Sequence, residues 1–156
     1  MHTLDDSPVV WDRTLAANDG ADSCHSSRFL CVFGSAAVLD RETGLVWQRT
    51  PPSGTEAWTA AINDCMNAPV AGRYGWRIPR IEEFQSLQTL PAGHPFTNLE
   101  PSSQYYWSST TYPDNSVAAY VAGFGAGEPS PVNTGGKTAS SEHVWCVRGG
   151  AGLEGQ

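Results

Sequence analysis

The sequence is poor in charged residues, and poorest in basic ones. Only 16% of its 156 residues are Asp, Glu, Lys or Arg, and nine Lys and Arg stand against sixteen Asp and Glu, which gives a formal net charge of -7. Capture of phosphate backbones and of sulfated glycans depends on clustered Lys and Arg. This composition argues against nucleic acid and against heparin-like polymers as partners.

Long hydrophobic runs and the common catalytic signatures are also absent. No apolar run approaches the roughly 20 residues that a membrane helix needs, so membrane insertion is not expected. There is no GxSxG, HExxH or phosphate-binding loop, and the glycines of FGSAAV and GFGAGEPS lack the strand-to-helix context that a nucleotide loop requires. A protein that is not an enzyme is therefore expected.

Metal-ligand spacings are missing as well. None of the four cysteines is spaced CxxC, and the four histidines form no pair at metal spacing apart from Cys24 beside His25, a geometry that is awkward for one ion. No zinc site and no other cofactor is predicted. Calcium would have to use Glu100, Asp114 or Glu128, and we interpret these acids as solvated loop carboxylates instead.

Glycine and proline are abundant, with 16 and 11 residues. They supply backbone angles that helices and strands exclude, so many turns and no long helices are expected. The length suits one domain that buries a sizeable core. We expect a single α+β domain over residues 1–156, in which residues 1–23 form a loosely ordered N-terminal arm.

Two short helices are predicted from the apolar periodicity. In RIEEFQSLQTL (80–90), the apolar residues Ile81, Phe84 and Leu87 are expected to point inward. In TEAWTAAINDCMNAP (55–69), a helix would end before Pro69, because proline cannot continue it. Its apolar residues recur at i, i+3, i+4, i+7 and i+8 and define an inward face made of Trp58, Ala61, Ile62, Cys65 and Met66.

Short apolar or alternating runs between turn residues predict strands before and after these helices. Gly44 is expected to take a positive φ angle in the turn DRETG, between two of the early strands. The late strands are predicted to form an antiparallel meander. The runs are SRFLCVF (27–33), AAVLD (36–40), TGLVWQR (43–49), YYWSSTTY (105–112), SVAAYVAGF (116–124) and EHVWCVR (142–148).

An even number of cysteines in a turn-rich chain indicates disulfides, and hence an oxidising compartment. Four cysteines allow three pairings, and the spacing alone does not choose among them. Cys65 on an inward helix face and Cys146 in a predicted strand favour a crosslink between the two elements. Cys24 with Cys31 would then close a short loop.

Four motifs, in the order AVLDRETGLVWQR, GRYGWRIPRIEEFQSL, YYWSSTTY and VWCVRGG, resemble the bacterial family named for the C-terminal domain of the Legionella collagen-like adhesin. The resemblance extends from about Trp11 to the end. It implies a C-type-lectin-like fold, with two short helices, a small antiparallel sheet and long irregular loops. It also implies a disulfide from the first helix to the last strand, Cys65 with Cys146. Arg80 stands where the family usually has a Thr, which would cap the second helix and pair with Glu83 in a capping box.

The same superfamily includes formylglycine-generating enzymes and calcium-dependent lectins. A reactive Cys146 would need a neighbour that stabilises a thiolate, and only Arg148 lies on the same face of the predicted strand. An oxidoreductase is therefore the weakest alternative. The lectin motif fails, because Glu-Pro is followed by Ser in both LEPSS and GEPSP and no acid follows Trp107.

Large aromatic and basic residues inside apolar strings are interpreted as structural. Arg77 and Arg148 are expected to be buried and paired with acids such as Asp40 or Glu83. The tryptophans of the four motifs are expected to fill the core rather than to stack on sugars. They are Trp47, Trp76, Trp107 and Trp145.

The polar segments among the late strands are the expected ligand face, since they combine the hydrogen-bonding residues that binding loops use. The sequence thus predicts a secreted adhesin or receptor-type domain, extracellular, cell-surface or periplasmic, for a protein or glycan ligand. Some proteins of the superfamily are variable and retroelement-diversified. The alternative is a cap or structural subunit of an extracellular assembly, and a homo-oligomer is left open. The expected ligand residues are Asp114, Asn115, Glu128, Asn133, Thr134, Lys137, Ser141 and His143.

Overall fold

The computed structural model describes residues 26–88, 90, 93–101, 103–124 and 131–149. Within these ranges the chain forms two helices and two sheets, so the fold is α+β, as the sequence predicts. The four-stranded sheet has the order β1-β2-β3-β9 and is antiparallel throughout. Its strands are β1 (Phe29–Val32), β2 (Ala37–Asp40), β3 (Leu45–Gln48) and β9 (Val147–Gly149).

The second sheet has five strands in the order β4-β8-β5-β6-β7. It is not purely antiparallel, because β8 pairs with β5 in parallel. Two of its strands, β4 and β7, lie in segments that the apolar pattern did not mark as strands. The five are β4 (Thr55–Glu56), β8 (Glu142–His143), β5 (Tyr106–Thr111), β6 (Ala118–Ala122) and β7 (Val132–Gly136).

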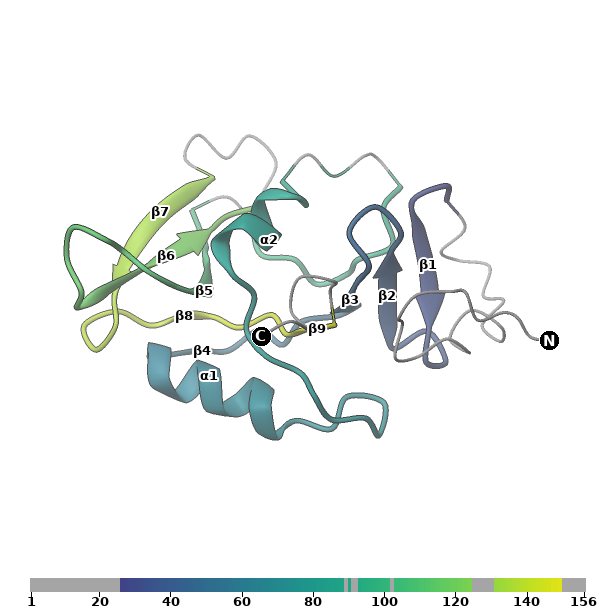
Figure 1. Ribbon diagram of the computed structural model, residues 1–156, viewed down its shortest axis with the longest axis horizontal. Helices are drawn as coiled ribbons and strands as arrows, with labels where there is room; N and C mark the ends of the chain where they lie inside the picture. Colours follow the sequence, from purple (N-terminus) through teal and green to yellow (C-terminus); the bar gives the residue numbers. More distant parts are fainter. Residues whose placement is uncertain (1–25, 89, 91–92, 102, 125–130, 150–156) are drawn as a thin grey trace.

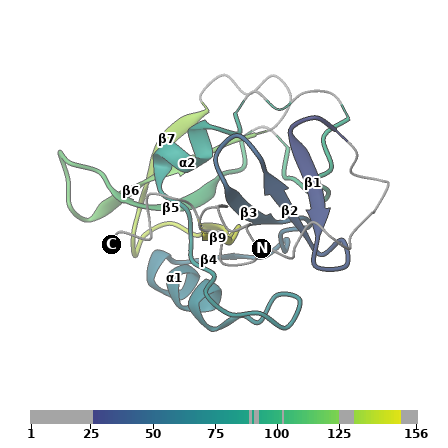
Figure 2. The ribbon, with the colours of Figure 1, turned by 45° about the vertical axis from the view of Figure 1, so that its right-hand side comes forward.

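Helix α1 (Trp58–Asn67) lies beneath β4 and β8, and α2 (Ile81–Gln85) lies on the opposite side, near β5 and β6 (Figures 1 and 2). In α1 Ala61 and Cys65 are buried, but Met66 is 58% exposed, so its expected inward position is wrong. The stripe of α1 that contacts the core is narrow, and Met66, the residue that follows Cys65, lies outside it. Among the described residues, no helix is both long and apolar enough to cross a membrane.

Helix α2 is shorter than the predicted run, although Ile81, Phe84 and Leu87 are buried as expected. The Glu83 carboxylate accepts the backbone N–H of Arg80 at 2.8 Å, which is half of a capping box, so the helix starts without a Thr. Leu87 is reached through a tighter turn, in which its N–H donates to the carbonyl of Phe84 at 2.9 Å.

The four tryptophans of the motifs are buried, which confirms their expected place in the core. Trp47 and Trp145 lie 5.1 Å apart between ring centroids, at the centre of one hydrophobic cluster. Trp76 and Trp107 belong to the second cluster, together with the sulfurs that join α1 to the end of the chain. Two cores therefore lie on either side of the segment that precedes β9.

Ion pairs connect the ends of several elements. Arg77 forms two 2.8 Å hydrogen bonds with Glu83, which confirms the expected pairing of this arginine. Asp40 is instead bonded by Arg28, at 2.9 and 2.8 Å. Arg148 donates through Nε to the carbonyl of Tyr74 at 2.9 Å.

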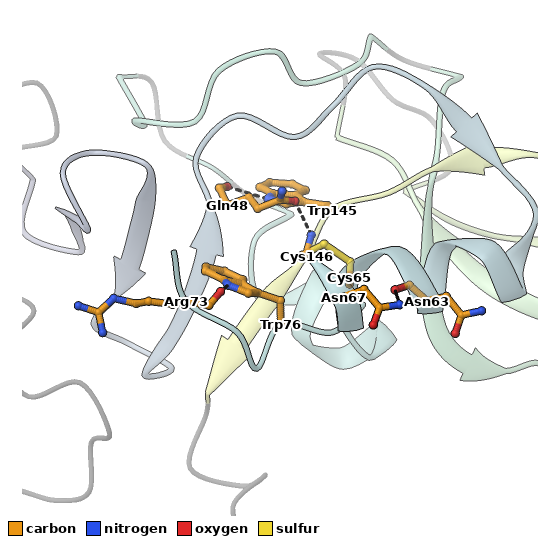
Figure 3. Close-up of a disulfide and its surroundings, with 8 residues drawn as sticks. All are labelled: Gln48, Asn63, Cys65, Asn67, Arg73, Trp76, Trp145 and Cys146. Atoms are coloured by element: carbon orange, nitrogen blue, oxygen red, sulfur yellow. Dashed lines mark hydrogen bonds between the residues drawn. A yellow bond between two sulfur atoms is a disulfide. The ribbon is translucent and has the colours of Figure 1, made fainter. Parts of the chain in front are cut away.

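The run EHVWCVR does not form one strand. It begins in the five-stranded sheet as β8, crosses between the sheets at 144–146, and continues as β9 in the other sheet. Gln48 holds the crossing segment: its Oε1 accepts the N–H of Cys146 at 2.7 Å, and its carbonyl accepts the indole N–H of Trp145 at 2.9 Å (Figure 3). An alternating pattern in the sequence cannot distinguish one strand from two that share a buried junction.

Cys65 and Cys146 form a disulfide across 81 residues of sequence, with their Cα atoms 5.5 Å apart (Figure 3). This confirms the predicted pairing of Cys65 with Cys146, although Cys146 lies in the crossing segment directly before β9 and not in the last strand itself. Cys31 is also disulfide-bonded, and Cys24, its expected partner, lies outside the described residues. The disulfide is the covalent connection between α1 and the segment that joins the two sheets.

Candidate functional site

Two connections meet at one end of the five-stranded sheet. The β5–β6 connection (112–117) lies beside the segment that follows β7, because the N–H of Lys137 donates to the carbonyl of Val117 at 2.8 Å and Gly136 pairs with Ala118. Both connections project from the same end of the molecule (Figure 1). We call this region the hairpin-end surface, made of Thr111, Asp114, Asn115, Val117, Lys137 and Ser141.

Lys137 is the only lysine of the chain, and its ammonium group is held in place. The Nζ atom lies 4.2 Å from the centroid of the Trp58 ring and donates a 2.9 Å hydrogen bond to the hydroxyl of Thr111. The backbone N–H of Trp58 in turn donates to the Lys137 carbonyl at 3.2 Å. A cation–π contact and a hydrogen bond therefore orient the positive charge before any ligand arrives.

The β5–β6 connection is shaped by its own residues. The Asn115 side chain accepts the N–H of Val117 at 3.3 Å, and its backbone carbonyl accepts the N–H of Ala118 at 3.0 Å. Asn115 thus serves the turn, while Asp114 remains exposed beside it. Val117 is 63% exposed, an apolar side chain among polar ones.

Asn133 and Thr134 lie away from this end, on the edge strand β7, and both are exposed. The Asn133 Oδ1 accepts the N–H of Thr134 at 2.9 Å, and the Ser140 hydroxyl accepts the N–H of Gly136 at 3.2 Å. In the β6–β7 register these two N–H groups point away from β6, because the residues that bond across the pair alternate with them. Local side chains therefore cap the outer edge of β7.

His143 is not on the surface. It is 5% exposed, which contradicts its expected place on the ligand face. The reason is that β8 lies inside the sheet, where His143 pairs with Thr55 on one side and with Tyr106 on the other. Glu128, another expected ligand residue, lies outside the described residues.

Three acids gather near α1, where the sequence offered no motif. Glu56 pairs with Glu142 across β4 and β8, and it also bonds to Asp64 of the helix. The hydrogen bond with Asp64, then partial burial and the charge of Asp64, raise the pKa of Glu56 to about 7. Burial also raises the pKa of Glu142. Among the residues that the structure describes, no group of three or more His, Cys, Asp and Glu could hold a metal ion.

The structure thus brings four of the eight expected residues together at the hairpin-end surface, namely Asp114, Asn115, Lys137 and Ser141. It also adds residues that sequence reasoning did not select for binding. The apolar spacing places Trp58 on the inward face of the helix, but Trp58 is the first residue of α1 and lies at its end, next to Lys137. The apolar pattern places Thr111 and Val117 in strands, and the single lysine is the signal in the sequence that points to this surface.

Comparison with known families gives one match. The family model described as the Lcl C-terminal domain matches residues 36–148, from just before β2 into β9. No curated protein matches the chain. The matched range contains both helices, the Cys65–Cys146 disulfide and the described part of the hairpin-end surface.

Proposed function

The chain belongs to the Lcl C-terminal domain family, and from this premise we propose that it is a secreted or cell-surface binding domain of adhesin or receptor type. The proposal includes a C-type-lectin-like fold and the absence of enzymatic activity. The observation on which it depends most is the hairpin-end surface, where an oriented ammonium, an exposed carboxylate and an exposed valine lie together. Rigid elements that present variable polar loops are a common arrangement for binding sites.

The support for binding comes from the way Lys137 is held. A free lysine loses side-chain entropy when a ligand orders it, whereas Lys137 is already positioned by Trp58 and Thr111. Asp114 supplies an acceptor, and Val117 supplies an apolar contact. One cation beside one exposed acid suits a protein or an uncharged glycan better than a sulfated polymer, which needs several clustered cations.

The non-enzymatic part of the proposal is supported by the cysteines. The nucleophile of a cysteine enzyme is the thiolate, and Cys146 is bonded to Cys65 instead. The alternative of an assembly subunit that grows by strand addition has less support. Along β7, the outward N–H groups of Thr134 and Gly136 are occupied by side chains of the same chain.

The test is a binding screen with the whole chain, which carries a label that is not attached to Lys137. The labelled protein is applied to an array of uncharged glycans and to immobilised cell-surface protein. A hit is then measured with the Asp114→Ala, Lys137→Ala double variant, which we expect to bind at least tenfold more weakly, about 1.4 kcal/mol. Arg41→Ala removes a positive charge at the exposed β2–β3 turn and should bind like the wild type.

Equal binding by the double variant and the wild type would place the ligand elsewhere on the molecule. Loss of binding in Arg41→Ala would show a nonspecific charge effect. Turnover of any array component, with release of a product, would contradict the non-enzymatic part of the proposal.

A further inference from the structure

His143 has a buried ring nitrogen that no protein group satisfies. Its Nδ1 atom is inaccessible to solvent and has no hydrogen-bond partner. Buried polar atoms are nearly always hydrogen-bonded, so such an exception requires an explanation. His143 lies on β8, between β4 and β5, and the proposed binding function does not use it.

The other ring nitrogen identifies the proton arrangement. Nε2 lies 3.1 Å from Oε1 of Gln104. An amide oxygen only accepts, so in this arrangement Nε2 carries the hydrogen and donates it. The neutral ring therefore has its hydrogen on Nε2, and Nδ1 presents a lone pair.

That lone pair faces a second acceptor. Oε2 of Glu100 lies 3.6 Å from Nδ1, and the Glu100 side chain is only 18% exposed. The separation is too long for a hydrogen bond, and no hydrogen is available to make one. One added proton would allow Nδ1 of His143 to donate a hydrogen bond to Oε2 of Glu100.

We propose that His143 and Glu100 form a binding site for a single proton, which connects the loop before β5 to the centre of the sheet when the solution becomes acidic. The proton comes from solvent and is bound to Nδ1. The ring then has two N–H groups, one donating to Gln104 and the other to the Glu100 carboxylate. A repulsive contact between lone pairs becomes a charge-assisted hydrogen bond.

The charged and titratable groups around the ring are compatible with this site. On β5, the Tyr106 ring lies 5.7 Å from the His143 ring between centroids, and its hydroxyl accepts the N–H of Glu100 at 3.0 Å. Burial raises the pKa of Tyr106 to about 12, so the phenol stays neutral. On β4, Thr55 opposite His143 does not titrate. Glu142, one residue away along β8, points to the other face of the sheet.

The loop that the proton secures is already bonded to the segment that follows β3. Asn98 donates to the carbonyl of Pro51 at 2.7 Å, and Thr97 N–H donates to the carbonyl of Arg49 at 3.0 Å. Glu100 is the point at which this loop approaches β8. The Glu100 side chain is 18% exposed, so its carboxylate connects Nδ1 with the solvent that supplies the proton.

The test is nitrogen NMR of the histidine rings in the whole chain. At about pH 8, His143 should be neutral with its hydrogen on Nε2, and it should become doubly protonated as the pH falls toward about 5. In Glu100→Gln the amide nitrogen can donate to Nδ1, so the ring should stay neutral over the same range. Glu82→Gln removes one exposed acid from α2 and should titrate like the wild type.

Thermal unfolding gives a second readout. The melting temperature of the wild type should rise relative to that of Glu100→Gln across this acid range, by a shift on the order of 2–4 °C. Stabilisation of the wild type but not of Glu100→Gln by zinc chloride at about pH 8 would overturn the proposal, because the pair would then hold a metal ion.

Three NMR results would also overturn the proposal. They are a hydrogen on Nδ1 at about pH 8, a ring that stays neutral down to about pH 5, and equal titration in the wild type and Glu100→Gln. The first uses the wild-type protein alone, so it tests the proposal even if the variant does not fold.

Discussion

Removal of the Cys65–Cys146 disulfide should strongly destabilise the protein, although the apolar side chains of the core all remain. The two cysteines are 81 residues apart in sequence, so the bond closes a long loop in the unfolded chain. In the chain-entropy model a loop of this length is worth about 4 to 5 kcal/mol. For a chain of this size, that corresponds to a fall in melting temperature on the order of 10–20 °C.

The double variant Cys65→Ala, Cys146→Ala tests this value without leaving an unpaired thiol. Both residues are buried, so alanine keeps each site apolar. The free energy of unfolding is measured by urea denaturation of the wild type and the variant. Hydrogen exchange then locates the change: the C-terminal half of α1 should lose protection. The backbone amide at position 146 should keep it, because Gln48 bonds the N–H and the carbonyl of that position at 2.7 and 3.1 Å.

Two results would refute this reasoning. A loss of stability under about 2 kcal/mol would mean that the unfolded chain is already constrained, so the disulfide removes little entropy. Loss of exchange protection along β3 and β9 before α1 would show that the disulfide, and not Gln48, holds the crossing segment. A matched control, Met66→Ala, changes an exposed apolar residue next to Cys65 and should alter stability by no more than about 0.5 kcal/mol.

Four further predictions follow from the same structure. Trp107→Ala should lower the free energy of unfolding by about 3 to 5 kcal/mol, because it leaves a cavity at a fully buried site, whereas Lys137→Ala should lower it by less than about 1 kcal/mol. Similar losses for the two variants would contradict the assignment of Lys137 to a binding surface. Burial opposes the charge of Glu83, but hydrogen bonds from Arg77 and from the Arg80 backbone outweigh this effect and lower the pKa of Glu83. The stabilisation from Glu83 should therefore be complete above about pH 4.3 and disappear at lower pH, and Glu83→Gln should remove this fall from a plot of melting temperature against pH. The pKa of Glu56 is raised to about 7, so its stabilisation is present at acidic pH and is lost as the pH rises toward 7. Glu56→Gln should melt at a higher temperature than the wild type above that pH, and a lower melting temperature there would count against the raised pKa. The chain should not be retained on a heparin column above about 0.15 M salt, and retention would reveal a basic patch around Arg73, Arg77 and Arg80.

Local pattern predicted the elements whose partners are close in sequence. The turn DRETG joins β2 and β3, and Gly44 has a φ of 79°, as its type of turn requires. Helix α1 follows from apolar spacing and ends before Pro69. Arg77 and Glu83 are six residues apart, within reach of each other once the helix forms.

The candidate surface could be predicted only in part. Polar loops between late strands directed attention to Asp114 and Lys137, and these residues do lie at one end of the sheet. The position of Trp58 beneath the ammonium group depends on α1 meeting the end of β7, about 80 residues away along the chain. No spacing in the sequence encodes that contact.

The sequence by itself therefore determined the two helices and most of the strands, the burial of the four motif tryptophans and the inward position of Cys65. Each of these depends on the period of apolar residues within one element. Only the tertiary structure decided that 142–148 divides between two sheets and that His143 is enclosed by β4 and β5. A strand is exposed or enclosed according to which distant strands pair with it, and that depends on packing against neighbours that are far away in the sequence.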